Sequence, residues 1–253
     1  MYDSKLLQFP HLHVTIKGEG VVFATKMTLD VLSPKAACVY CGSSPGTSPE
    51  FMQVATAVGK ALGEAGITLV YGGGRRGLMG GVAFACARAG GKVLGVIPQA
   101  IKTSGGEGTG EKVASENAGD ETIWSTVEDI VVSTMHDRKK RMAVESGAFI
   151  GLPGGFGTFE EVLEVVTWNQ LGIHSKPVIV LNVLGYYEPL RQMVQTGIQA
   201  GFIKPQNASL VKIVDAPVDG DWGKAATEAL RTWKPDDGAG YGWSWTDQGI
   251  KAI

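Results

Sequence analysis

The chain has 253 residues, 44% of them apolar, and can therefore bury a full hydrophobic core. Its 23 Lys and Arg residues against 25 Asp and Glu residues leave a formal charge of −2. No global field therefore favours a nucleic-acid backbone or an anionic membrane as a partner.

From Ala36 onward, short β-branched runs alternate with longer helical patterns. This alternation predicts successive βαβ units and a parallel sheet, in an α/β domain over residues 35–214. Residues 1–34 show no clear hydrophobic period and are predicted to be an N-terminal arm or extension. The predicted strands cover residues 37–44, 67–74, 92–98, 128–133, 148–155 and 177–182. The predicted helices cover residues 49–65, 78–89, 135–146, 158–171 and 186–200.

Two segments interrupt or follow this alternation. Residues 99–122 are polar, glycine-rich and longer than an ordinary connection, so they are either a mobile functional loop or a disordered insertion. Residues 215–253 hold one more predicted helix, at 226–233, and a tail of Gly, Trp and Asp. We expect this last segment to pack on the same domain or to extend from it.

Glycine-rich turns follow three of the predicted strands, at residues 41–46, 71–81 and 152–161. In parallel sheets, ligands bind outside the carboxyl ends of the strands, where such turns lead into helices whose free N–H groups attract anions. Tight packing explains any one of these turns. Their recurrence at three strand ends favours a phosphate site.

Two familiar nucleotide-binding motifs fit the sequence poorly. Gly72, Gly74 and Gly77 match G-x-G-x-x-G, but the next predicted strand ends at residues 95–98 without the acid that would hold a dinucleotide ribose. No G-x-x-x-x-G-K-[ST] sequence occurs, so a phosphate-binding loop of the ATPase type is absent.

The best candidate for a phosphate cradle is residues 153–158, Pro-Gly-Gly-Phe-Gly-Thr. Three glycines let backbone amides approach an anion, and Thr158 adds a hydroxyl at the predicted start of a helix. Thr158 and Glu161 also have capping-box spacing, which gives Glu161 two interpretations. It either satisfies a backbone N–H at the helix start, or it is an ionised carboxylate that faces a developing cation or orients a water.

A basic cluster opens the helix predicted at 135–146, with the sequence Met-His-Asp-Arg-Lys-Lys-Arg. Cations at a helix N-terminus cost roughly 0.3 to 1 kcal/mol each, so the cluster calls for a compensating anion. In one interpretation it is a solvated face on which Asp137 and Arg141 pair at i, i+4. In the other, Arg138, and with it Lys139, grips the substrate.

The sequence predicts neither a metal site nor a cofactor. Cys38 and Cys41 form C-x-x-C, but a strand places residues i and i+3 on opposite faces, which argues against a metal or redox pair. No G-x-S-x-G elbow of a serine hydrolase occurs. The histidines lack a companion cluster of ligands, and an isolated histidine is usually structural: His11, His13, His136 and His174.

The N-terminus and the cysteines favour an intracellular protein. The first residues lack the basic segment and apolar run of a secretory signal, and no apolar run approaches the ~18 to 20 residues of a membrane span. Three cysteines are too few, and odd in number, for a disulfide framework. We therefore predict a cytoplasmic protein that binds neither nucleic acid nor membrane.

Two motifs together carry a family resemblance. Residues 135–139 read M-H-x-R-K and residues 153–161 read P-G-G-x-G-T-x-x-E. In these motifs the chain resembles the LONELY GUY (LOG) family of cytokinin-activating phosphoribohydrolases. The likeness runs from about Ala36 to Val214 and includes the sequences CGSS, YGGGRRGLMG and VTWNQLGIH.

The resemblance implies a Rossmann-like three-layer α/β fold with a mostly parallel central sheet, and a homodimer or higher homo-oligomer. It implies hydrolysis of N6-modified adenosine monophosphates, often with AMP as a further substrate. Arg138 and Glu161 are then the catalytic pair, and the glycine-threonine segment binds the phosphate. The predicted substrate-binding residues are Ser43, Gly73, Gly74, Met135, Arg138, Lys139, Gly154, Gly155, Gly157, Thr158, Glu160 and Glu161.

The arm, the 99–122 loop and the tail depart from the shorter plant-type members. The family's loop region contributes a substrate-contacting acid, for which Glu121 is the candidate here. Whether Arg138 acts on phosphate, ribose or base stays open. Two alternative functions are a nucleotide carrier without hydrolysis and a lysine decarboxylase. The latter lacks support, since no lysine has a recognisable pyridoxal-phosphate setting.

Overall fold

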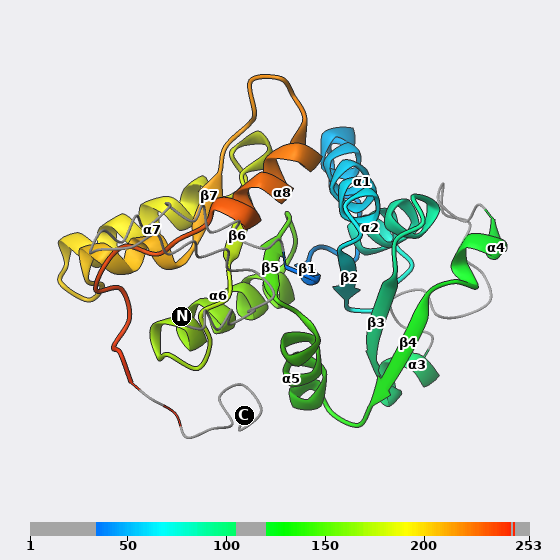
Figure 1. The fold of residues 1–253 in the computed structure, drawn as a ribbon, viewed down its shortest axis with the longest axis horizontal. Helices are drawn as coiled ribbons and strands as arrows, with labels where there is room; N and C mark the ends of the chain where they lie inside the picture. Colours follow the sequence, from blue (N-terminus) through cyan, green and yellow to red (C-terminus); the bar gives the residue numbers. More distant parts are fainter. Residues whose placement is uncertain (1–33, 105–119, 244, 246–253) are drawn as a thin grey trace, which may run out of the picture. The chain divides into compact units, whose positions relative to one another are not determined.

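The computed structural model describes residues 34–104, 120–243 and 245 (Figure 1). Apart from Pro34, the predicted arm with His11 and His13 lies outside the described residues, as do residues 105–119 and the end of the tail. Among the residues that are described, no helix has the length and apolar character needed to cross a membrane.

One sheet of seven strands forms the centre of the described chain, and each pair of neighbouring strands is parallel. The strand order is β4-β3-β2-β1-β5-β6-β7. The predicted α/β fold with a parallel central sheet is thus confirmed. The strands are β1 Ala36–Tyr40, β2 Thr68–Tyr71, β3 Val93–Pro98, β4 Glu128–Val132, β5 Ala148–Gly151, β6 Val178–Leu181 and β7 Lys212–Val214.

The helices begin and end close to the predicted ranges, with one exception. Helix α8 begins at Trp222 instead of residue 226, because the Asp221 side chain caps it by accepting from the backbone N–H of Lys224 at 2.9 Å. The long helices are α1 Pro49–Glu64, α2 Gly77–Arg88, α5 Met135–Glu145, α6 Phe156–Gln170, α7 Glu188–Gln199 and α8 Trp222–Thr232.

Several short elements correct the sequence prediction. The ends of the expected 99–122 loop are helical, as α3 Gln99–Thr103 and α4 Glu121–Trp124. Strand β7 was not predicted, because three residues with an exposed lysine at the start show no clear alternation. Two 3-10 turns, η2 Val183–Gly185 and η3 Pro205–Leu210, were likewise not predicted.

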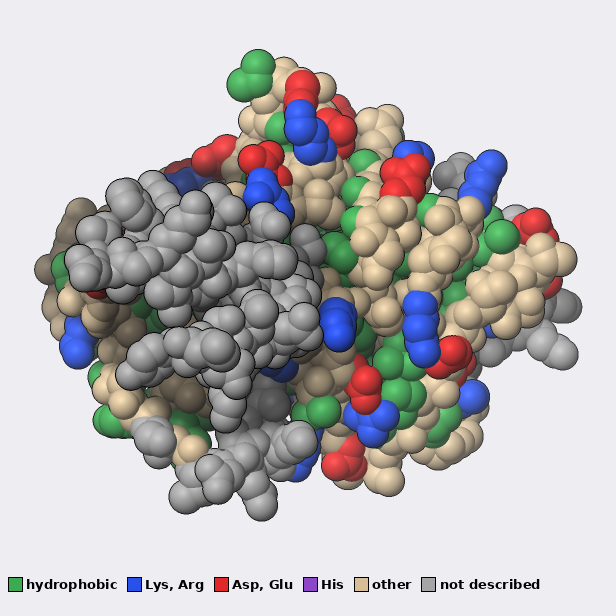
Figure 2. Space-filling view, viewed as in Figure 1, with side chains coloured by type: hydrophobic (Ala, Val, Ile, Leu, Met, Phe, Trp, Pro, Cys, Tyr) green, Lys and Arg blue, Asp and Glu red, His purple; other side chains and the backbone are tan. Residues whose placement is uncertain are grey.

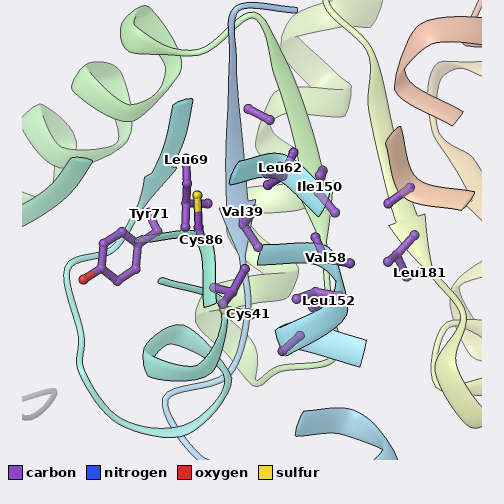
Figure 3. Packing of buried hydrophobic residues seen from close by; sticks show 14 of the residues in the cluster. Val39, Cys41, Val58, Leu62, Leu69, Tyr71, Cys86, Ile150, Leu152 and Leu181 are labelled. Atoms are coloured by element: carbon purple, nitrogen blue, oxygen red, sulfur yellow. The ribbon is translucent and has the colours of Figure 1, made fainter. Parts of the chain in front are cut away.

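Helices cover both faces of the sheet, with α1, α2 and α8 on one face and α5 and α6 on the other (Figure 1). On the first face, Val39 of β1, Leu62 of α1 and Ile150 of β5 are buried in one apolar cluster, part of which Figure 3 shows. Each such side chain contributes roughly 1.5 to 3 kcal/mol by leaving water. Burial on both faces explains why these strands read as nearly continuous apolar runs.

Close helix packing on that face depends on glycine. A Cβ atom at Gly59 of α1 would lie 2.1 Å from the carbonyl oxygen of Val82 on α2. A Cβ atom at Gly223 of α8 would lie 2.7 Å from the carbonyl oxygen of Ala57 on α1. Part of the high glycine content therefore serves packing of the backbones, as one interpretation of the glycines proposed.

Charges are mixed over the surface that Figure 2 shows. Acidic and basic side chains of the described residues alternate there without forming a block of one sign. This mixture agrees with the formal charge of −2. Attraction of an anion must then come from a local group of donors.

Candidate active site

The three glycine-rich turns meet at the carboxyl end of the sheet. The chain runs from β1 outward to β4 and then returns to β5 on the other side of β1, so its order reverses between β1 and β5. Such a reversal opens a crevice for ligands. The backbone N–H of Gly42 donates to Pro153 O at 3.0 Å, and that of Met79 donates to Gly42 O at 3.2 Å. A Cβ atom at Gly77 would lie 2.4 Å from the carbonyl carbon of Ser43.

Arg138 reaches this crevice from α5. The helix start is fixed by a capping box that the sequence analysis missed: Asp137 N donates to Thr134 Oγ1 at 3.0 Å, and Thr134 N donates to Asp137 Oδ2 at 3.1 Å. The next residue, Arg138, is 5% exposed and donates from Nη2 to the carbonyl oxygen of Gly72 at 2.9 Å. A cation is therefore held at the end of β2.

The neighbouring residues of the basic cluster differ from Arg138 in exposure or in partners. Asp137 serves the capping box, and Arg141 pairs at 2.7 Å with Glu145, so the expected Asp137–Arg141 pair is wrong. Met135, a predicted substrate-binding residue, is 46% exposed at the start of α5, and His136 is exposed beside it. The cluster is thus not a solvated face throughout, because Arg138 is buried while Met135 and His136 are exposed.

Lys139 ties α5 to α6. Its Nζ lies 2.5 Å from a carboxylate oxygen of Glu160 and 2.9 Å from one of Glu164. Burial alone would lower the pKa of Lys139, but the hydrogen bonds to the two carboxylates outweigh it and hold that pKa above its usual value. Lys139 and Glu160, both predicted to bind substrate, are therefore partners of each other, and their contact with substrate stays a prediction.

Helix α6 begins earlier than predicted, which changes the interpretation of Glu161. Its first residue is Phe156 and its N-cap is Gly155, so Thr158 is the third residue of the helix and Glu161 the sixth. The capping box expected between Thr158 and Glu161 is wrong, because Thr158 is not at the N-cap. Glu161 also lies in the second turn, where the helix dipole acts more weakly than in the first.

The charges of Glu161 and Arg138 act on the same strand. Burial is the main cause that raises the pKa of the Cys38 thiol in β1, the negative charge of Glu161 raises it further, and the positive charge of Arg138 opposes both. Burial, with Cys38 and Glu161, also raises the pKa of Tyr40. The charges of the two predicted catalytic side chains thus both act on β1, one from α5 and one from α6.

The start of α6 offers an open backbone surface. Its N-cap makes no side-chain cap, and the first intrahelical bond runs from Phe159 N to Gly155 O at 3.1 Å. The helix itself therefore supplies no acceptor for the N–H groups of residues 156–158. A Cβ atom at Gly155 or Gly157 would meet nothing within 4 Å. These donors and this space are what an anion needs.

Gly154 and Thr158 shape the turn from within. A Cβ atom at Gly154 would lie 2.1 Å from Thr158 Oγ1 and 2.9 Å from Gly42 N. Thr158 is 4% exposed, so its hydroxyl is packed against the turn rather than presented on the surface. The predicted glycine at 154 is thus required by the turn, whereas Gly155 and Gly157 leave room beside it.

The turn after β2 carries the other predicted glycines. Gly73 has a φ of +81°, and a Cβ atom there would lie 2.1 Å from Cγ1 of Ile97. Gly74 is buried beside it, while Ser43, in the turn after β1, is exposed. The positive φ and the close contact with Ile97 explain why residue 73 is glycine, without a ligand. Substrate binding by Ser43, Gly73 and Gly74 stays a prediction.

Glu121 lies beside that same turn. Its carboxylate is 3.5 Å from a guanidinium nitrogen of Arg75, whose Cζ lies 4.9 Å from the centroid of the Trp124 ring. Arg75 therefore links the first residue of α4 to the glycine turn at 71–81. This position is compatible with the acid predicted from the resemblance.

Two adjacent tyrosines in the connection after β6 hold the turn after β5, and sequence reasoning missed both. Tyr187 Oη donates to Leu152 O at 2.7 Å, and Tyr186 Oη donates to Gly154 O. Their contacts span more than thirty residues of sequence, so no local pattern indicates them. The one available signal was the sequence Gly-Tyr-Tyr at 185–187, which begins four residues after the end of the buried strand β6.

The remaining cysteine and histidine predictions concern the core. Cys38 and Cys41 belong to apolar clusters on opposite faces of the sheet, as their spacing predicted. His174 is buried, and its Nδ1 accepts from the backbone N–H of Lys176 at 3.1 Å. Across residues 34–104, 120–243 and 245, no group of three or more His, Cys, Asp and Glu side chains is arranged to hold a metal ion.

Comparison with known proteins places most of the chain in one group. Residues 79–220 match a family model described as "Possible lysine decarboxylase". A probable cytokinin riboside 5′-monophosphate phosphoribohydrolase of Oryza sativa subsp. japonica is 39% identical over 230 residues, which are 91% of this chain and 83% of that protein. A cytokinin riboside 5′-monophosphate phosphoribohydrolase of Arabidopsis thaliana is 46% identical over 183 residues, which are 72% of this chain and 76% of that protein.

Solved structures support the fold. A Moco carrier protein from Chlamydomonas reinhardtii superposes with a TM-score of 0.50 at 22% identity, over 77% of this chain and 96% of that one. At this level of identity the likeness concerns the arrangement of strands and helices alone.

Proposed function

The chain belongs to the LONELY GUY (LOG) family of cytokinin riboside 5′-monophosphate phosphoribohydrolases, and from that premise we propose that it hydrolyses the N-glycosidic bond of N6-modified adenosine monophosphates. The products are the free base and ribose 5-phosphate, and AMP is a further substrate. One observation carries the proposal: the open amides that begin α6 lie on the same helix as Glu161 and beside the turns that hold Arg138.

The 5′-phosphate binds at the start of α6. The N–H groups of residues 156–158 and the space beside Gly155 and Gly157 accommodate its oxygens. Binding energy from this remote group orients the ribose, so that C1′ lies beside the catalytic side chains. A substrate without the phosphate loses this anchor.

Arg138 acts at the sugar or the base. Its guanidinium is held by Gly72 at the end of β2, whereas the phosphate amides follow β5. These two strands flank β1, so they are two strand spacings apart, about 10 Å. That separation suits the two ends of a nucleoside monophosphate better than two contacts to one phosphate.

Glu161 acts on the developing positive charge. As the C1′–N9 bond breaks, its electron pair stays with the base, and the sugar becomes an oxocarbenium-like cation. Ionised Glu161 stabilises this cation and takes a proton from the attacking water, whose oxygen forms the new bond to C1′. Arg138 stabilises the negative charge that develops on the departing base, which then takes a proton from solvent, while Glu161 releases the water proton to solvent.

Exposed apolar side chains on α5 and α6 support a homodimer. The Lys139 ion pairs to α6 place the two helices side by side. Their exposed apolar residues are Met135 (46%), Val144 (37%), Phe156 (92%), Phe159 (39%) and Leu163 (38%). A second copy would cover these side chains. Leu163→Asp should then shift the mass measured by light scattering from that of a dimer to that of a monomer.

We also propose that the protein is cytoplasmic, because its cysteines are few and buried.

One assay tests the activity. The protein is incubated with isopentenyladenosine 5′-monophosphate, AMP and isopentenyladenosine, and the released bases are separated by chromatography. We expect cleavage of the monophosphates and little of the riboside. Tight AMP binding without base release would instead indicate a carrier. Visible absorbance with added pyridoxal phosphate, and carbon dioxide from lysine, would indicate a decarboxylase.

A further inference from the structure

Donors from outside the turn hold three successive carbonyl groups after β5. Leu152 O accepts from Tyr187 Oη at 2.7 Å, Pro153 O accepts from Gly42 N at 3.0 Å, and Gly154 O accepts from Tyr186 Oη. We propose that Tyr186 is a positioning residue of the phosphate site, whose hydroxyl sets the direction of the Gly155 N–H. The inference rests on the proposed function, because it concerns the same phosphate cradle.

The argument begins with the peptide unit between Gly154 and Gly155. This peptide bond is trans, so its C=O and N–H groups point in opposite directions within one plane. A hydrogen bond that fixes the Gly154 carbonyl toward Tyr186 therefore turns the Gly155 N–H away from Tyr186. Gly155 borders open space, where a ligand oxygen has room to accept that N–H.

Neighbouring rings hold the Tyr186 side chain in place. The Phe51 ring of α1 meets it edge-on, with centroids 6.1 Å apart and planes at 78°. The Phe159 ring of α6 stacks against it at 6.2 Å and 24°. Aromatic contacts from two helices thus fix the ring without its hydroxyl. Removal of the hydroxyl alone should then leave the ring in place and release the Gly154 carbonyl.

Tyr187 provides a matched control one residue away. Its hydroxyl donates to Leu152 O, and the N–H side of that peptide belongs to Pro153, which has no N–H. The Tyr187 hydrogen bond therefore orients no donor toward a ligand. Tyr187 is 2% exposed, so loss of its hydroxyl leaves a buried carbonyl without that partner and weakens the fold.

The test compares Tyr186→Phe with Tyr187→Phe, using isopentenyladenosine 5′-monophosphate as substrate. For Tyr186→Phe we expect KM to rise about tenfold, the effect of one lost hydrogen bond to a charged group, with kcat within twofold of wild type. For Tyr187→Phe we expect an unchanged KM and a lower melting temperature. An unchanged KM in Tyr186→Phe, or an equal rise in both variants, overturns the inference.

A binding measurement separates this inference from the proposed activity. The amide resonance of Gly155 is followed by NMR while inorganic phosphate is added to wild type and to each variant. We expect the resonance to move in wild type and Tyr187→Phe, and to move at about tenfold higher phosphate in Tyr186→Phe. A wild type that binds phosphate but releases no base defeats the proposed function alone. Equal titration of Gly155 in all three proteins defeats the positioning role alone.

Discussion

Arg138 is fixed against the backbone of Gly72, to whose carbonyl oxygen its Nη2 donates at 2.9 Å. Contact at this point is so close that a Cβ atom at Gly72 would lie 2.1 Å from Nη2. The absence of a side chain at residue 72 therefore sets where the guanidinium of α5 can lie. Glycine directly after β2 thus accommodates the guanidinium of Arg138, the arginine that we propose to be catalytic.

Gly72→Ala should move the guanidinium without unfolding the chain, because the group that must shift is the end of a flexible side chain. A displacement of about 1 Å can cost about 100-fold in rate, so we expect kcat to fall by that order. Gly197→Ala is the control. Gly197 lies in α7, more than a hundred residues from Gly72 in the sequence, and a Cβ atom there would also press on a flexible side chain, that of Ile203. Equal kcat values in the two variants would contradict the placement of Arg138.

Gly157→Ala should change stability and substrate affinity in opposite directions. The new methyl group meets no other part of the described structure, and alanine is favoured over glycine in a helix by up to about 1 kcal/mol. The melting temperature should therefore stay or rise. If phosphate occupies this space, KM for the monophosphates should rise at least about tenfold. A rise in melting temperature with an unchanged KM would place the phosphate elsewhere.

The order of most strands and helices could be predicted because short apolar runs alternate along the sequence with longer helical patterns. Val39 and Ile150 lie in buried strands that read as apolar runs, and the turns between elements are rich in glycine. The same logic failed at β7, whose three residues begin with the exposed Lys212. Short edge strands depend on pairing with a neighbour more than on their own pattern.

The candidate site was predictable where a local motif carries it and not where distant segments meet. Arg138 and Glu161 stand in motifs, but the start of α6 was misplaced because Thr158 and Glu161 have the spacing of a capping box, which favours Thr158 as the N-cap. Tertiary contacts around Gly154 override that preference. Tyr186 reaches Gly154 across 32 residues, which no periodicity reveals.

Glu161→Gln should strongly reduce turnover with little effect on folding. Because Glu161 lies in the second turn of α6, the substitution leaves the helix start intact. Loss of the negative charge removes stabilisation of the oxocarbenium-like cation and the acceptor for the water proton, and we expect kcat to fall by about 10² to 10⁴. Glu164→Gln, one turn further along, is the control. Retained turnover in Glu161→Gln would remove this residue from the mechanism.

Lys139→Met should separate an inter-helix contact from a substrate contact. The ion pairs to Glu160 and Glu164 are partly exposed, so we expect a loss of about 1 kcal/mol in the free energy of unfolding, or about 2 to 4 °C in melting temperature. If the ion pairs are the whole role of Lys139, KM stays within twofold of wild type. A higher KM at an unchanged melting temperature would instead assign Lys139 to the substrate.

His174 should make the fold sensitive to acid. Burial, with the nearby positive charge of Lys176, lowers the pKa of His174 from 6.5 to about 4. Its Nδ1 already accepts from the backbone N–H of Lys176, so a proton there would break that hydrogen bond. Above pH 6.5 the imidazole is neutral in both folded and unfolded chains, and its contribution to stability is complete. Between pH 6.5 and about 4, His174 binds a proton in the unfolded chain but not in the folded chain. The free energy of unfolding therefore falls as the pH falls.

The acid sensitivity can be measured from urea unfolding at several pH values. A pKa difference of this size corresponds to about 3 kcal/mol lost by pH 4. His174→Asn keeps an acceptor for the Lys176 N–H but cannot take up the proton, so its stability should depend less steeply on pH in this range. His136→Asn, at an exposed position on α5, should keep the wild-type slope. Identical slopes in wild type and His174→Asn would mean that the imidazole is protonated as readily in the folded chain as in the unfolded one.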